Sequence, residues 1–129
     1  MVHVTGFFAG ILAFMFIGLS FLVIRQRRLV RTSLGHGGDD ELYRRVRAQG
    51  NFAEYVPFAL ILLAFGEGKG TPVWIIVVLG MGLIAGRVAH AYSLLVAEAE
   101  NPENYQLRTV GMIMTFTVIG LGALLAIFG

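Results

Sequence analysis

Four polar side chains of complementary chemistry recur along one segment of an otherwise apolar sequence. Arg44, Arg47, Asn51 and Glu54 follow one another at intervals of three or four residues. On an α-helix, which turns about 100° per residue, they lie within a sector of about 80°, and Tyr55 flanks it. Two cations, an amide and a carboxylate on one helix face can bind an elongated zwitterion through ion pairs and hydrogen bonds.

A purely structural interpretation of these side chains stays open. Arg44 can extend its charged end to a membrane interface. Glu54 can pair instead with Arg87, which lies inside another apolar segment together with His90 on the same helix face. Because a charge within a membrane needs a partner, an Arg87–Glu54 ion pair between two helices competes with a ligand-binding role for Glu54.

The composition excludes an ordinary soluble domain. Hydrophobic residues make up 57% of the 129 residues and charged residues 14%, against about 25% charged in soluble proteins. The chain has no cysteine, which excludes disulfides, thiolate–metal sites and a catalytic thiol. The formal net charge is only +2, so the basic residues do not indicate a nucleic-acid partner.

Apolar segments long enough to cross a membrane organise the whole chain. A transmembrane helix needs about 20 apolar residues. The sequence predicts four such helices, at residues 4–24, 41–65, 73–97 and 107–128. The expected fold is therefore an all-α integral membrane protein, with residues 1–129 forming a single four-transmembrane-helix bundle.

Basic residues cluster directly after the first predicted helix and indicate the topology. Arg25, Arg27, Arg28 and Arg31 fall in the expected first loop. Since cytoplasmic loops carry the excess of Lys and Arg, we expect the first and third loops in the cytoplasm and both termini outside.

Three segments resemble those of a known family. Residues 44–57, RRVRAQGNFAEYVP, resemble the second-helix signature of the MAPEG family, the membrane-associated proteins of eicosanoid and glutathione metabolism. Residues 87–90, RVAH, look like the third-helix segment of its prostaglandin E synthase branch, and residues 108–109 like the opening of its fourth helix. The glycine-rich first loop is most similar to bacterial members, which implies a multi-pass protein of the bacterial inner membrane.

The resemblance implies an assembly and a ligand. The expected assembly is a homotrimer that holds glutathione, a co-substrate, between neighbouring subunits on the cytoplasmic side. Arg108 corresponds to the arginine that stabilises the glutathione thiolate and is the expected catalytic residue. A first-helix arginine, Arg25 or Arg28, is expected to reach the site. The residues expected to bind glutathione are Arg44, Arg47, Gln49, Asn51, Glu54, Tyr55, Arg87 and His90.

The activity implied by the resemblance is that of a glutathione transferase or peroxidase acting on a lipophilic electrophile from the bilayer. Leu94 stands where the family often has a tyrosine, and the loop before Arg108 is longer than in the eicosanoid enzymes, so no eicosanoid substrate is assigned. Two alternatives remain: a proton carrier that uses Glu54, and a non-catalytic, lipid-binding membrane subunit in which the charges only hold helices together.

Overall fold

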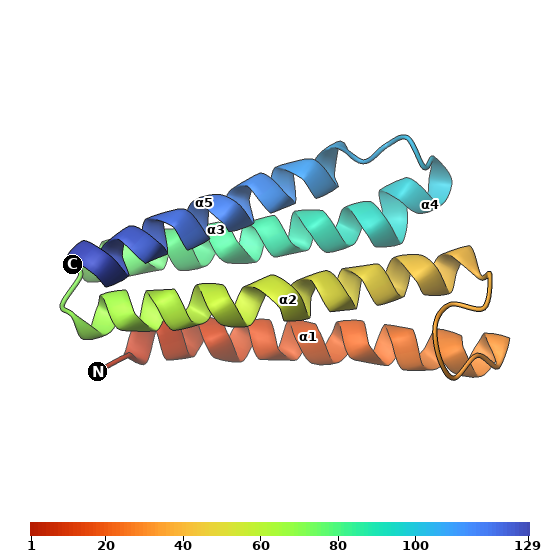
Figure 1. Ribbon diagram of the computed structural model, residues 1–129, viewed down its shortest axis with the longest axis horizontal. Coiled ribbons are helices and arrows are strands. Elements are labelled where there is room, and N and C mark those ends of the chain that lie inside the picture. The colour runs from red at the N-terminus through yellow and green to blue at the C-terminus, as the bar shows by residue number, and fades with distance from the viewer.

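Four long helices run side by side through the computed structural model, which describes residues 1–129 (Figure 1). They are α1 (His3–Val30), α2 (Asp40–Gly68), α3 (Val73–Tyr92) and α5 (Gln106–Phe128). A π-helical turn, η1 (Ser93–Ala97), and the short α4 (Glu98–Glu100) continue the path of α3. Both termini lie at the same end of the bundle, beside the α2–α3 loop (Figure 1).

Each long helix can cross a membrane by its length and composition. The four spans contain 28, 29, 28 and 23 residues, the third running from Val73 to Glu100. At 1.5 Å per residue the shortest is about 35 Å long, which exceeds the roughly 30 Å hydrocarbon layer. The expectation of four transmembrane helices therefore agrees with the structure.

The first helix is longer than expected. It continues past Ile24 to Val30 and ends where Arg31 adopts a left-handed conformation with φ of 54°. Arg25, Arg27 and Arg28 therefore belong to the helix and not to the loop, which corrects the predicted boundary. Arginine is a good helix former, and cations are favourable at the carboxyl end of the helix dipole, so the basic segment prolongs α1.

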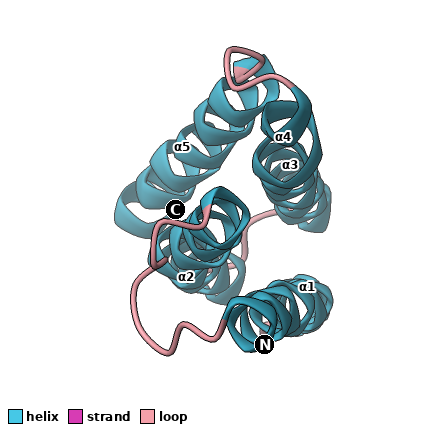
Figure 2. Cartoon of the chain, turned by 90° about the vertical axis from the view of Figure 1, so that its right-hand side faces the viewer, coloured by secondary structure: helices cyan, strands magenta, loops and turns pink.

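The helices form two neighbouring pairs, α1 with α2 and α3 with α5, and α2 also packs along α5, as the view along the bundle shows (Figure 2). Small residues set the distance within the second pair. A Cβ on Gly111 would lie 2.5 Å from the carbonyl oxygen of Gly86 and 2.8 Å from the backbone nitrogen of His90. Glycine is thus required where α3 and α5 meet, and this close approach brings the polar residues of α3 against α5.

Candidate functional site

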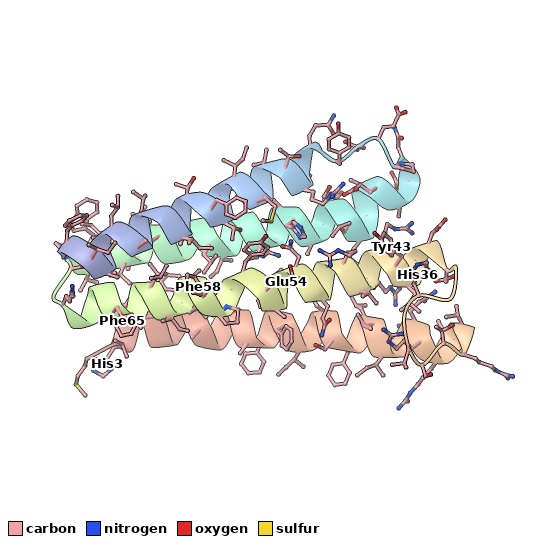
Figure 3. The ribbon with its side chains drawn as sticks, in the orientation of Figure 1. His3, His36, Tyr43, Glu54, Phe58 and Phe65 are labelled. Atoms are coloured by element: carbon pink, nitrogen blue, oxygen red, sulfur yellow. The ribbon has the colours of Figure 1, made fainter.

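A polar pocket of about 520 Å³ opens at the end of the bundle that carries the first and third loops. Tyr43, which belongs to its lining, lies near this end, whereas Glu54 lies about midway along α2 (Figure 3). Arginines and carboxylates from several elements meet in it. Its lining comprises Asp40, Tyr43, Arg44, Arg47, Asn51, His90, Leu94, Glu98, Pro102, Arg108 and Met112.

The start of α2 is fixed by Asp39, which caps the helix. Its carboxylate accepts a hydrogen bond from the backbone nitrogen of Leu42 at 2.8 Å and another from the side-chain amide of Gln26 on α1 at 3.1 Å. These two hydrogen bonds lower the pKa of Asp39 below its ordinary value, because both favour the ionised form. The cap anchors the segment of α2 that presents Arg44, Arg47 and Asn51 to the pocket.

Arg87 is buried behind the pocket and orients Asn51. It is 1% exposed, and its Nη2 donates to the side-chain oxygen of Asn51 at 2.6 Å. The same guanidinium lies 3.4 Å from His90 Nδ1 and donates to Thr115 at 3.4 Å. Because Arg87 occupies the amide oxygen of Asn51, the amide nitrogen is left to donate to an acceptor in the pocket.

The alternative in which Glu54 pairs with Arg87 is not what the structure shows. Arg87 bonds Asn51 instead, and Glu54 lies 3.8 Å from Arg47 on its own helix, with 55% of its side chain exposed. The polar face of α2 therefore divides: Arg44, Arg47 and Asn51 line the pocket, whereas Glu54 is exposed on the outside of the chain.

Arg108, the predicted catalytic residue, lines the pocket and holds a carboxylate that the sequence reasoning did not single out. Its Nε donates to Glu98 Oε2 at 3.1 Å, and its Nη2 lies 3.0 Å from Glu98 Oε1. Ser93 donates to the same Oε2 at 2.8 Å. The one signal for Glu98 in the sequence is that it is the first acid after the third apolar segment.

Several expected site residues lie outside the pocket of a single chain. Gln49 faces α1, where its amide lies 3.4 Å from the Ser20 hydroxyl. Tyr55 packs edge-on against Phe116 of α5, with ring centroids 5.4 Å apart. Arg25 and Arg28 line a separate hollow along α1. Thus the chain brings together Arg44, Arg47, Asn51, His90 and Arg108, with Arg87 directly behind them.

Electrostatically, the pocket suits an anionic or zwitterionic ligand. Arg44, Arg47 and Arg108 supply cations, while Asp40 and Glu98 supply carboxylates. No group of three His, Asp or Glu side chains is close enough to hold a metal ion. The site can therefore bind carboxylates by ion pairs and can stabilise a negative charge that develops beside Arg108.

Comparison with known proteins identifies the family. The MAPEG family matches residues 5–128, nearly the whole chain. The chain belongs to the MAPEG family. Two relatives named inner membrane protein YecN, from Escherichia coli strain K12 and Escherichia coli O6:H1, are each 37% identical over 89 residues, which is 69% of this chain and 68% of the relative. No solved structure gives a significant match.

The family and the four spans agree on the location. This MAPEG chain has four helices that are long and apolar enough to span a membrane, and its relatives are named as inner membrane proteins. It is a multi-pass protein of the bacterial inner membrane.

Proposed function

We propose that the protein is a membrane-bound, glutathione-dependent transferase or peroxidase that acts on lipophilic electrophiles. The observation that carries the proposal is the pocket, where Arg44, Arg47 and Arg108 meet Asn51 and Asp40. Glutathione has two carboxylates, an ammonium group and a thiol. The pocket offers arginines to the carboxylates, Asp40 to the ammonium group, and a further arginine to the sulfur.

Arg108 is the residue we assign to the thiol. A free thiol has a pKa of about 8.5, and a neighbouring cation favours its ionised, nucleophilic form. The contacts of Arg108 with Glu98 use Nε and Nη2, which leaves Nη1 for a ligand. Ionisation transfers the thiol proton to water in the open pocket. The thiolate then forms a carbon–sulfur bond with the electrophile, whose leaving group departs as an anion with the electron pair of the bond that breaks.

A second hollow supports a lipophilic co-substrate. It has a volume of about 390 Å³ and shares Arg108 and Met112 with the polar pocket. From there it follows α5 past Ile113 and Phe116, which are 60% and 53% exposed on the outer face of the chain. An apolar molecule dissolved in the bilayer can approach Arg108 along this face, and hence the sulfur that we assign to it.

The homotrimer is part of the same proposal. Glu54 and Tyr55, which the family resemblance associates with glutathione, lie outside the pocket of one chain. An exposed carboxylate midway along a membrane helix is costly against lipid, so this face of α2 is suited to contact with a neighbouring subunit. Association through α2 would bring these residues toward a glutathione molecule shared between subunits.

The proton-carrier alternative has less support. It requires Glu54 to titrate beside Arg87, but the two do not pair, and Glu54 instead lies near Arg47. The pocket also contains Asn51 and three arginines, which a proton carrier does not require.

Calorimetric titration of the detergent-solubilised protein with glutathione tests the proposal. We expect saturable binding that is weakened in Arg44→Ala and unchanged in Arg45→Ala. Arg45 is the matched control, because it has the same charge on the same helix but pairs with Glu41 and with the carbonyl oxygen of Leu22. Absence of binding to the wild type, or equal loss in both variants, would refute the proposed function.

A further inference from the structure

Glu98 is a buried carboxylate in the lining of the pocket, and both of its oxygens contact protein side chains. Its side chain is 9% exposed. One oxygen accepts from Ser93 at 2.8 Å and from Arg108 Nε at 3.1 Å, and the other lies 3.0 Å from Arg108 Nη2. A carboxylate in this position places a negative charge directly beside the cation that we assign to the thiolate.

The π-helical turn η1 explains how Glu98 reaches this position. The backbone nitrogen of Glu98 donates to the carbonyl oxygen of Ser93, five residues earlier, and the two side chains also bond each other. In an uninterrupted α-helix, residues five apart point about 140° away from each other. The widened π turn brings them onto one face, and such turns occur frequently at functional sites.

We propose that Glu98 is the resident counter-ion of Arg108 and limits how much of the guanidinium charge acts on a bound thiolate. The inference rests on the proposed function, since the thiolate is that of glutathione. Glu98 acts through Arg108 and is therefore a positioning residue: it holds the Nε–Nη2 edge, while Ser93 holds the carboxylate.

The counter-ion has a chemical use. A guanidinium favours the thiolate, whereas a nearby carboxylate opposes it, so the pair lowers the thiol pKa less than Arg108 alone would. Thiolate nucleophilicity falls as the thiol pKa falls, and a thiol with a pKa near the ambient pH reacts fastest. Glu98 thus keeps the bound thiol reactive instead of over-stabilising its anion.

Other charged and titratable groups face the same pocket, and the experiment must hold them constant. They are Asp40, Tyr43, Arg44 and Arg47 from α2 and His90 from α3, with Tyr105 next to Arg108.

The test is an ultraviolet titration of thiolate absorbance in the glutathione complex. Glu98→Gln removes the charge but keeps the size, and we expect the pKa of the bound thiol to fall by about one unit, as for one charge several ångströms away in a partly exposed site. In Glu98→Asp the side chain is shorter by one methylene group and the carboxylate lies farther from Arg108. The pKa of the bound glutathione thiol should therefore also fall, but by less than in Glu98→Gln. The acid limb of the pH–rate profile should move with the thiol pKa.

Glu100→Gln is the matched control, because it removes the same charge two residues away from an exposed position and should leave the thiol pKa unchanged. An unchanged or raised thiol pKa in both Glu98 variants would reduce the Arg108–Glu98 contact to a structural ion pair and overturn the inference.

A second measurement separates this inference from the proposed function. Phenylglyoxal modifies arginines, and mass spectrometry of the Arg108 peptide reports its rate without any glutathione. We expect faster modification in Glu98→Gln than in wild type or Glu100→Gln. If the wild type binds no glutathione, the proposed function fails. In that case, equal rates of Arg108 modification in Glu98→Gln and wild type overturn the counter-ion role of Glu98 as well. A faster rate in Glu98→Gln supports that role, with another anion in place of the thiolate.

Discussion

The two ends of the bundle differ in what their charged residues contact. At the end with both termini, Glu67 accepts from the backbone nitrogens of Val4 and Thr5 at 2.8 and 2.7 Å, and Lys69 donates to the carbonyl oxygen of Ala126. The last turn of α2 and the residue that follows it thus cap the amino end of α1 with an anion and the carboxyl end of α5 with a cation, each matched to the helix dipole.

At the other end, Asp39 caps α2 and Arg27 donates to the carbonyl oxygens of Thr32 and Gly35, but the arginines that line the pocket donate to no backbone group. Arg44 and Arg47 project into a pocket, and the contact of Arg47 with Glu54 is a long 3.8 Å. The comparison teaches that the same kinds of charged residue stabilise the fold where they meet backbone groups and remain available to a ligand where they surround an open volume. Variants at the two ends should therefore affect different properties.

The largest effect is expected at Arg108. Arg108→Ala should reduce turnover with a lipophilic electrophile such as a chloro-dinitrobenzene by about 100-fold at neutral pH, the usual cost of removing one group that stabilises a developing anion. The thiol pKa of bound glutathione should rise toward its free value, so part of the turnover should return at alkaline pH. Arg108→Lys should rescue partially, since it keeps the charge but not the planar fork. Identical pH–rate profiles in wild type and Arg108→Ala would remove Arg108 from the mechanism.

The next largest effect is expected for Arg47 and Asn51, which lie on the polar face of α2. Arg47→Ala or Asn51→Ala should weaken glutathione binding by about 1.5–3 kcal/mol, the usual worth of hydrogen bonds to charged groups. Calorimetric titration measures this loss, and the melting temperature should change little for Arg47→Ala, because its side chain is 44% exposed. Normal glutathione binding in both variants would show that Arg47 and Asn51 have a structural role and do not bind the ligand.

A smaller effect, on stability alone, is expected at the opposite end. Glu67→Ala should destabilise the protein by about 1–2 kcal/mol, because two backbone donors of α1 lose their acceptor. Thermal unfolding in detergent measures the change, with glutathione affinity as the second readout. A loss of affinity without a loss of stability would contradict the division between the two ends.

The smallest effect is expected at Lys69. Lys69→Ala should cost about 0.3–1 kcal/mol of stability, the range for a cation at an exposed helix carboxyl end. The same unfolding assay applies, and the loss should shrink in high salt because the interaction is screened. A salt-independent loss would indicate packing and not the helix dipole.

Specific residues show which features of the site the sequence predicts. The helical period placed Arg44, Arg47 and Asn51 on one face correctly, because those residues share a single helix. The sequence left open whether Glu54 pairs with Arg87, because the period of one helix does not say which face of the next helix meets it; the structure excludes that pair. The sequence does not indicate the contact of Glu98 with Arg108, because Glu98 reaches Arg108 through a π turn, which breaks the regular helical period.

The sequence by itself determined the four membrane helices, because the length of an apolar segment is a local property of the chain. It also determined the order of the cations, the amide and the acid along α2. Only the tertiary structure decided which charges meet. The close approach of Gly86 and Gly111 brings α3 against α5, Arg87 bonds Asn51 across from α2, and the turn at Ser93 aims Glu98 at Arg108. These pairings depend on the distance and rotation between helices, and those follow from side-chain packing between segments far apart in the chain.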